Sequence, residues 1–299
     1  MILVIGDLIL DESSIFNSDR MCPEAQVPVF KLNKKFFFIG GAGNVANNLK
    51  NLNSNVFLIS KTGNSENSKK LLKMIKNRKI KNKIFIQNSS CTTKKRIFNN
   101  SKMVLRIDDD CNISFNKSEI SKIKNFITKN IFKFKILIIS DYNKGLINKK
   151  LYSEVTRIFN LNNKIVITNP KKRQIKFYDG CDIIIPNQME FDNFFKKKIN
   201  LNSKIKILFR KIKNLKHLIV TRGHKNLIYK KNQKKIKLFK INKVIPSDVT
   251  GASDTFIATL SFMILRGKSV NFAIEKAILA SKKIIQKKYT SLIKLKEIT

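Results

Sequence analysis

The chain has 299 residues, with 61 Lys and Arg against 20 Asp and Glu, which gives a formal net charge of +41 at pH 7. A hydrophobic fraction of 42% excludes a disordered chain, and no apolar run reaches the roughly 18 residues that span a bilayer, so we expect no membrane partner. The charge comes mainly from lysines spread along the chain, whereas a nucleic-acid footprint is clustered and rich in Arg, so we expect no specific nucleic-acid partner.

Short apolar, β-branched runs alternate with longer amphipathic stretches along the chain. The apolar runs predict strands at 2–5, 56–60, 136–140, 165–168, 183–185, 218–221, 227–229 and 236–239. Apolar residues at three- and four-residue spacing predict helices at 44–52, 118–130, 149–159, 204–212, 252–265 and 270–286. Continuous apolar strands are typical of a mostly parallel sheet between two helix layers. We therefore predict an α/β fold with a three-layer α/β/α core.

Two segments, 12–38 and 84–107, interrupt this alternation. They contain short strands with no helix between them, at 26–31, 94–98 and 103–107. Strands that leave a sheet at separate points of the sequence can form a small lid over its carboxyl edge. Because the chain has no Pro- or Ser-rich linker and no internal repeat, we expect one domain over residues 1–299 with an inserted β lid.

The first candidate site is the glycine-rich turn Gly40-Gly41-Ala42-Gly43-Asn44, between an apolar run and a helical stretch. Such a turn lets a ligand approach the backbone and directs amides toward it. The turn also satisfies the loose G-x-G-x-x-A dinucleotide pattern, but Lys61 stands where that pattern needs an acid to hold the ribose. A turn that serves only to pack the helix remains the alternative.

The second candidate site is Asp248-Val249-Thr250-Gly251-Ala252-Ser253-Asp254, which leads into an apolar helix. Amides at a helix N-terminus favour an anion, and Asp254 in the first turn could accept a proton from a hydroxyl beside that anion. Phosphoryl transfer requires these two elements. The alternative is an ordinary helix start, with Thr250 as the cap and an acid in the first turn.

Two common nucleotide-binding motifs and one kind of metal site are excluded by the sequence. Gly267-Lys268-Ser269 ends like a P-loop, but Phe262 stands where the first glycine belongs, and the protein-kinase His-Arg-Asp triplet does not occur. Only two histidines, His217 and His224, are present, which excludes a histidine-rich metal site. The four cysteines form no CxxC pair and the start carries no basic leader, so we expect a cytoplasmic protein.

The two candidate sites together resemble the signatures of the ribokinase-type (PfkB) sugar kinases. Between them, Asn187-Gln188-Met189-Glu190 is similar to that family's N-x-x-E element, and Thr221-Arg222-Gly223 to its T-x-G nucleotide-binding turn. Four elements in the family's order cover nearly the whole chain. The resemblance implies a ribokinase-like fold and a sugar kinase that uses ATP and Mg²⁺.

Within this family, the finer resemblance is to the D-glycero-β-D-manno-heptose-7-phosphate kinases. Pro23-Glu24-Ala25-Gln26-Val27-Pro28-Val29 looks like that group's P-E-A-P-V-P-V lid segment, and Ser140-Asp141-Tyr142-Asn143-Lys144-Gly145 matches a further block. It implies phosphorylation of heptose 7-phosphate at the anomeric hydroxyl, in ADP-heptose (lipopolysaccharide core) biosynthesis. Many such kinases are fused to a C-terminal nucleotidyltransferase; at this length, and without an H-x-G-H signature, we expect no such domain here.

The resemblance also implies a role for each matched residue. Asp254 would be the catalytic base, and the anion hole would be formed by the amides of Gly251, Ala252 and Ser253. ATP and Mg²⁺ would be bound by Asn187, Glu190, Thr221, Gly223, Asp248 and Thr250, with Glu190 reaching the Mg²⁺ through water. The sugar would contact Asp7, Asp11, Gly40, Gly41, Asn44 and Asp141, and its 7-phosphate would contact Lys95, Arg96 and Arg106.

Three departures and two alternatives accompany this assignment; the first departure is Gln26, which stands where the group's lid segment has Pro. Ser253 replaces the last glycine of the family's G-A-G-D, and Asn169 replaces the acid of its D-P-K-G block. The chain could be another PfkB-type sugar or nucleoside kinase, or a non-catalytic polyanion-binding protein on a decayed kinase fold. The presence of Asp254, Asn187 and Glu190 argues against decay. Exposed lid strands need their edges covered, and related kinases pair their lids, so we expect a homodimer that binds a small sugar phosphate.

Overall fold

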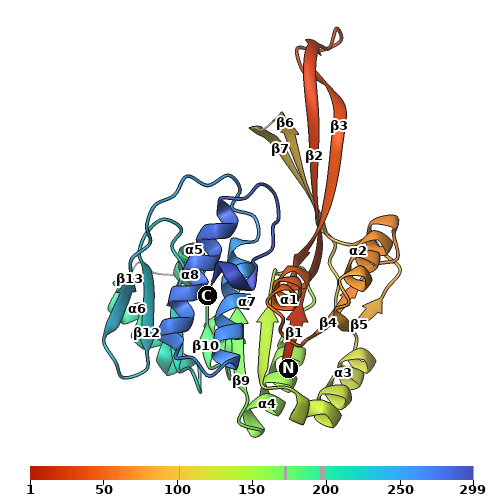
Figure 1. The fold of residues 1–299 in the computed structure, drawn as a ribbon. Helices are drawn as coiled ribbons and strands as arrows, with labels where there is room; N and C mark the ends of the chain where they lie inside the picture. Colours follow the sequence, from red (N-terminus) through yellow and green to blue (C-terminus); the bar gives the residue numbers. More distant parts are fainter. Residues whose placement is uncertain (101, 172–173, 196–198, 299) are drawn as a thin grey trace.

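The computed structural model describes residues 1–298 apart from 101, 172–173 and 196–198; residue 299 of the expected domain therefore lies outside the described residues. Among them, nine strands form the main sheet, in the order β13-β12-β11-β10-β9-β8-β1-β4-β5 (Figure 1). These are β1 (Ile2–Gly6), β4 (Val56–Thr62), β5 (Lys81–Ile86), β8 (Ile136–Ser140), β9 (Ile165–Asn169), β10 (Ile183–Ile184), β11 (His217–Val220), β12 (Leu227–Lys231) and β13 (Ile236–Phe239). Neighbours pair in parallel from β5 to β11, and β12 and β13 are antiparallel.

Helices cover both faces of this sheet (Figure 1). On β1, Ile2 and Val4 face one hydrophobic core and Leu3 and Ile5 face the other, because successive side chains point to opposite faces. The first core contains residues of α1 (Ala42–Asn51), α2 (Glu66–Asn77), α7 (Ala252–Leu265) and α8 (Val270–Ile285). The second contains residues of α3 (Lys117–Asn130), α4 (Lys149–Leu161), α5 (Gln188–Asn193) and α6 (Leu201–Lys211). The predicted three-layer α/β/α core is confirmed.

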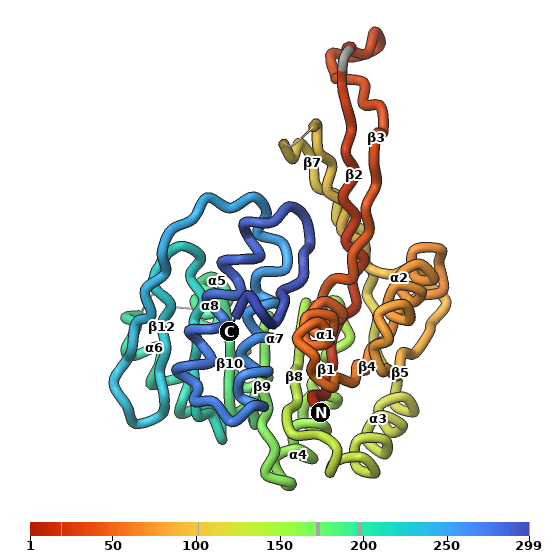
Figure 2. The backbone as a smooth tube through the Cα atoms, viewed as in Figure 1, coloured from red at the N-terminus to blue at the C-terminus, as the bar shows by residue number. Residues whose placement is uncertain are grey.

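A separate four-stranded sheet, in the order β3-β2-β6-β7, forms the lid. Its strands are β2 (Leu8–Met21), β3 (Pro28–Gly41), β6 (Thr93–Asn99) and β7 (Lys102–Asp109). Figures 1 and 2 show the β2–β3 hairpin standing away from the body. Two expectations are corrected: residues 84–86 belong to β5, because they pair with β4 in the main sheet, and the strand expected from residue 26 begins at Pro28. Residue 101 of the expected lid segment lies outside the described residues.

The loop after α8 packs against the base of the lid. The ring of Tyr289 stacks on Phe36 and Phe38 of β3, with centroids 5.2 and 6.2 Å apart, and meets the ring of Phe98 on β6 edge-on at 5.8 Å. These ring contacts join the lid to the C-terminal part of the core. Among the described residues, no helix is both long and apolar enough to cross a membrane.

Candidate active site

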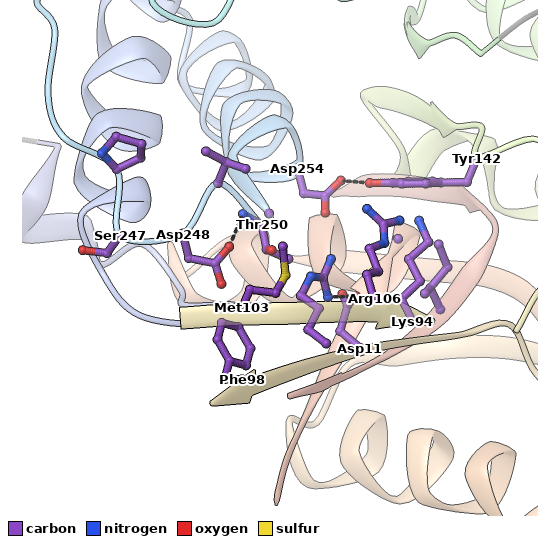
Figure 3. A pocket seen from close by; sticks show the side chains of 16 residues that line it. Asp11, Lys94, Phe98, Met103, Arg106, Tyr142, Ser247, Asp248, Thr250 and Asp254 are labelled. Atoms are coloured by element: carbon purple, nitrogen blue, oxygen red, sulfur yellow. Dashed lines mark hydrogen bonds and ion pairs between the residues drawn. The ribbon is translucent and has the colours of Figure 1, made fainter. Parts of the chain in front are cut away.

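A cavity of about 490 Å³ lies between the lid and the start of α7 (Figure 3). The lid supplies charged and apolar side chains, and the loop before α7 supplies the opposite wall. The lining residues are Ile9, Asp11, Gly41, Lys94, Arg96, Phe98, Met103, Arg106, Tyr142, Pro246, Ser247, Asp248, Val249, Thr250, Gly251 and Asp254. The structure therefore brings together eight residues that the sequence analysis singled out: Asp11, Gly41, Arg96, Arg106, Asp248, Thr250, Gly251 and Asp254.

Asp254 is buried in the first turn of α7, with 4% of its surface exposed. Its Oδ1 accepts a hydrogen bond from the hydroxyl of Tyr142 at 2.5 Å, and its Oδ2 accepts one from Nδ2 of Asn44 at 2.9 Å. Gly251 precedes the helix with a φ of +78°, and a Cβ there would lie 2.8 Å from Nδ2 of Asn44. A glycine at this position thus allows α7 to approach α1 closely enough for the Asn44–Asp254 contact.

Burial raises the pKa of Asp254 to about 6, and the nearby carboxylate of Asp11 acts in the same direction. Hydrogen bonds from Tyr142 and Asn44 and the charge of Lys171 oppose this rise. The carboxylate is therefore ionised at neutral pH and yet basic enough to accept a proton. A general base requires both properties.

The expected anion hole is only partly available in this structure. The amide of Ala252 donates to the carbonyl of Val249 at 3.3 Å, which closes a turn. The amide of Thr250 donates to Oδ1 of Asp248 at 2.8 Å, and Ser253 is exposed at the helix start. Gly251 is the member of the expected trio that lines the cavity.

The lid presents cations to the cavity from alternate positions of β6. Lys94 and Arg96 line the cavity, and Lys95 is absent from its described lining because neighbouring residues of a strand point to opposite faces. The expectation for Lys95 is thus corrected in favour of Lys94. Arg96 pairs with Oδ1 of Asp11 at 2.9 Å.

Arg106 on β7 stands opposite Arg96 in the strand register. Its guanidinium donates to both oxygens of Asp108, each at 2.7 Å. Like charges placed opposite each other on neighbouring strands repel. A bound anion would relieve that repulsion, so this part of the cavity favours one.

Two lysines lie near the ring of Tyr142. Nζ of Lys94 lies 5.2 Å from the centre of the Tyr142 ring, and Nζ of Lys171 lies 5.3 Å from it. Burial lowers the pKa of Lys94, and the charge of Arg106 acts in the same direction while Asp11 opposes it. Figure 3 shows Asp254 and Tyr142 along one side of the cavity, with Lys94 and Arg106 on the lid strands across from them.

Asp7 and Asp141, expected to contact the sugar, lie outside the described lining of the cavity. Oδ2 of Asp7 accepts from the amide of Tyr142 at 2.7 Å, and its Oδ1 from the amide of Leu146 at 3.3 Å. Burial, followed by the charge of Asp141, raises the pKa of Asp7 to about 6. Oδ1 of Asp141 accepts from the amide of Asn143 at 2.8 Å. Both acids hold the loop that carries Tyr142, and their expected contact with the sugar stays a prediction.

The glycine-rich turn places backbone against the two acids of the lid base. Gly41 has a φ of +61°, and a Cβ there would lie 2.3 Å from the carbonyl oxygen of Asp7. A Cβ at Gly40 would lie 2.4 Å from Oδ2 of Asp11. The turn thus keeps the carboxylate of Asp11 at the cavity wall.

Asn187 and Glu190 form the start of α5 at the carboxyl end of β10. The Asn187 side chain accepts from the amide of Glu190, and Oε2 of Glu190 accepts from the amide of Asn187, each at 2.8 Å. Oε1 of Glu190 pairs with Nζ of Lys171 at 2.5 Å. Asn187 also forms an isolated bridge with Thr221, which follows β11, and Gly223 lies in the exposed turn beyond. These four expected nucleotide-side residues lie outside the lining of the cavity.

Three residues of the site were not proposed from the sequence: Lys94, Tyr142 and Lys171. The period-two alternation of a strand could have placed Lys94 beside Arg96. Tyr142 follows the buried strand β8, and residues at the carboxyl ends of parallel strands commonly face a ligand. Lys171 stands at the lysine of the family's D-P-K-G block, in which Asn169 replaces the acid, so that block could have identified it.

Comparison with known proteins agrees with this geometry. The family model for the pfkB family carbohydrate kinases matches residues 1–297. The chain belongs to this family. It is a carbohydrate kinase, a sugar phosphotransferase, with the ribokinase-like fold.

This pfkB kinase is similar to two curated proteins that are longer than the chain. It is 31% identical over 302 residues to the bifunctional protein HldE of Helicobacter pylori strain J99, covering 99% of the chain and 65% of that protein. It is 32% identical over 302 residues to the bifunctional protein HldE of Sulfurimonas denitrificans, covering 99% of the chain and 63% of that protein. The chain thus spans less than two thirds of these relatives.

Solved structures show the same fold at low sequence identity. Phosphofructokinase-2 from Escherichia coli, in complex with potassium, has a TM-score of 0.80 at 12% identity and covers 100% of this chain and 96% of its own. Ribokinase from Thermotoga maritima has a TM-score of 0.76 at 18% identity and covers 99% of this chain and 97% of its own.

Proposed function

We propose that this kinase transfers the γ-phosphoryl group of ATP to the anomeric hydroxyl of D-glycero-β-D-manno-heptose 7-phosphate, giving the 1,7-bisphosphate for ADP-heptose and lipopolysaccharide core synthesis. The observation that carries the proposal is the layout of the cavity, with buried Asp254 on one side and lid cations on the other. This layout suits a sugar with a reacting hydroxyl at one end and a phosphate at the other. Similarity to the HldE proteins and the lid segment 23–29 supports heptose as the sugar.

In the proposed reaction, Asp254 accepts the proton of the anomeric hydroxyl as its oxygen bonds to the γ-phosphorus. The bond from that phosphorus to the bridging oxygen breaks, and ADP leaves with the electron pair. Gly251 and the N-terminus of α7 face the charge on the transferred group. Asp11, Gly40 and Gly41 would contact the sugar hydroxyls.

The sugar's own phosphate would be held by Lys94, Arg96 and Arg106. Arg96 and Arg106 are partly neutralised by Asp11 and Asp108, and Lys94 is half-buried. Charge-assisted hydrogen bonds to a phosphate are among the strong polar contacts of proteins. A sugar without this phosphate would therefore bind weakly.

ATP and Mg²⁺ would lie toward Asn187, Glu190, Thr221 and Gly223. The carboxylate and amide oxygens of Glu190 and Asn187 fit Mg²⁺, which keeps several waters and binds with substrate phosphates. No cluster of three His, Cys, Asp or Glu side chains that could hold a metal ion occurs within the described part of the chain. When bound, Mg²⁺ would supply positive charge to the ATP phosphates, and Lys171 beside Glu190 would supply more.

We further propose a cytoplasmic homodimer that pairs through its lids. Along β7, Met103, Val104, Leu105 and Ile107 are each 43–52% exposed, and β7 is an edge strand of the lid sheet. Exposed apolar edges are commonly covered by another chain. Light scattering at micromolar concentration should give twice the monomer mass; a monomer mass would refute the dimer.

A panel of acceptor sugars tests the substrate assignment. Each sugar is incubated with ATP and Mg²⁺, and ADP release and the position of the new phosphate are measured by a coupled assay and ³¹P NMR. Heptose 7-phosphate should be turned over with the highest kcat/KM. Faster turnover of ribose or fructose 6-phosphate would refute the heptose assignment but leave a pfkB sugar kinase.

A further inference from the structure

Two buried side chains, Asn44 and Asn48, connect Asp254 to the C-terminal segment. Asn44 and Asn48 lie one turn apart on α1, and both are almost fully buried. Nδ2 of Asn48 donates to Oδ1 of Asn44 at 3.1 Å and to its carbonyl oxygen at 3.0 Å. Oδ1 of Asn48 accepts from the backbone amide of Ile293 at 3.2 Å and from the hydroxyl of Thr255 at 3.4 Å.

The backbone amide of Ile293 fixes the order of donors and acceptors along this series of hydrogen bonds. The amide of Ile293 can only donate, so the oxygen of the Asn48 side chain must face it. The NH₂ group of Asn48 then faces the oxygen of Asn44. As a result the NH₂ group of Asn44 is directed to Oδ2 of Asp254.

We infer that Asn48 is a positioning residue, which orients the Asn44 amide so that a donor and never an acceptor faces the carboxylate of Asp254. This role rests on the proposed function of Asp254 as the base. The donor stabilises the ionised carboxylate and fixes its direction. With the amide of Asn44 reversed, its carbonyl oxygen would face the carboxylate and favour the protonated form.

Besides the hydrogen bonds through Asn44 and Asn48, several charged and titratable groups surround Asp254. Tyr142 follows β8, Lys171 follows β9 and Asp11 lies on β2; the cavity adds Lys94, Arg96 and Arg106 from the lid and Asp248 from the preceding loop. A substitution must therefore be separated from a general change of charge. Asn47 offers this control, because its Oδ1 accepts from Nε of Arg78 and takes no part in the chain to Asp254.

The test compares Asn48→Asp with Asn47→Asp. An aspartate at 48 still accepts from Ile293 but cannot donate to Asn44, so the Asn44 amide should reverse. We expect kcat to fall about tenfold or more, with KM for both substrates within about threefold, and the acid limb of the kcat profile to move to higher pH. Asn47→Asp should leave all three unchanged. Equal effects of the two variants, or an unchanged kcat and pH profile in Asn48→Asp, would overturn the inference.

Two further measurements keep the test decisive. If Asn48→Asp does not fold, a cycle of Asn48→Ala, Asn44→Ala and the double variant replaces it. The loss of kcat caused by Asn48→Ala should vanish when Asn44 is already replaced, and additive losses would refute the positioning role of Asn48.

A ¹³C NMR titration of the Asp254 carboxyl measures its pKa without any turnover. If wild type fails to phosphorylate heptose 7-phosphate while the pKa of Asp254 is raised in Asn48→Asp, that combination would support the positioning role of Asn48 and refute only the proposed substrate. An unchanged pKa of Asp254 in Asn48→Asp would refute the positioning role itself.

Discussion

The hydroxyl of Tyr142 donates to Oδ1 of Asp254 across the seam between the loop after β8 and the start of α7, with an oxygen-to-oxygen distance of 2.5 Å. The backbone amide of Tyr142 in turn donates to Asp7. The buried carboxylate of Asp7 thus positions Tyr142, whose hydroxyl contacts Asp254. This arrangement gives Asp254 a fixed direction and a pKa that its surroundings control.

The pKa of Asp254 predicts an acid limb in the pH profile. The base must be ionised, and burial raises its pKa to about 6, so kcat/KM should fall as the pH drops below about 6, by tenfold per unit at the lowest values. The measurement is kcat/KM from pH 4.5 to 8.5. A profile that stays flat down to pH 4.5 would contradict the assignment of a buried base.

Tyr142→Phe should move this limb to higher pH. Removing the hydroxyl takes away a hydrogen bond that lowers the pKa of Asp254, while the ring that lies near Lys94 and Lys171 remains. The control is Tyr229→Phe, whose hydroxyl contacts His217 on the far part of the sheet. An identical limb in wild type and Tyr142→Phe would show that the hydroxyl does not tune the base.

Lys94→Ala and Lys95→Ala form a matched pair on one strand. Losing a charge-assisted contact of about 1.5–3 kcal/mol should raise KM for the sugar phosphate about 10- to 100-fold in Lys94→Ala. KM for ATP should change little in Lys94→Ala. Lys95→Ala should resemble wild type, because the side chain of Lys95 does not line the cavity. The idea fails if Lys95→Ala has the larger effect, or if both substrates are affected equally.

Much of the fold follows from the sequence. The helix predicted at 252–265 matches α7 residue for residue, because Gly251 precedes a continuous apolar stretch. Helix α2 was missed because it is rich in lysine, with Leu71 and Ile75 among its few apolar residues, although Ser65 caps its start. Strand β5 was assigned to the lid because an edge strand with alternating exposure carries the same pattern as a lid strand.

The site was predictable in kind but not in detail. Motifs identify Asp254 and Asp11, but the choice between Lys94 and Lys95 depends on the register in which Asp11 pairs with Lys94. Similarly, an acid at a strand end can face a ligand or the backbone, and Asp7 faces the amides of the loop from 142 to 146. These facts depend on pairing between distant segments, which no local pattern records.

Tyr289 should anchor the lid to the core. It has a φ of +59°, a region rarely adopted by residues other than glycine, and its ring contacts three phenylalanines. Tyr289→Ala should lower the free energy of unfolding by about 1.5–4.5 kcal/mol, since each of the three aromatic pairs contributes about 0.5–1.5 kcal/mol. Tyr289→Phe retains the ring and should stay close to wild type. Urea unfolding measures both; equal stability of the alanine variant and wild type would refute the anchor.

The most direct test of the account is a coupled ATP assay of heptose 7-phosphate with wild type and Asp254→Asn. Wild type should turn over this sugar, and the variant should keep both KM values while its kcat falls by about 10²–10⁴, the contribution of a general base. Full turnover by Asp254→Asn would contradict the central claim that the buried carboxylate at the start of α7 accepts the proton.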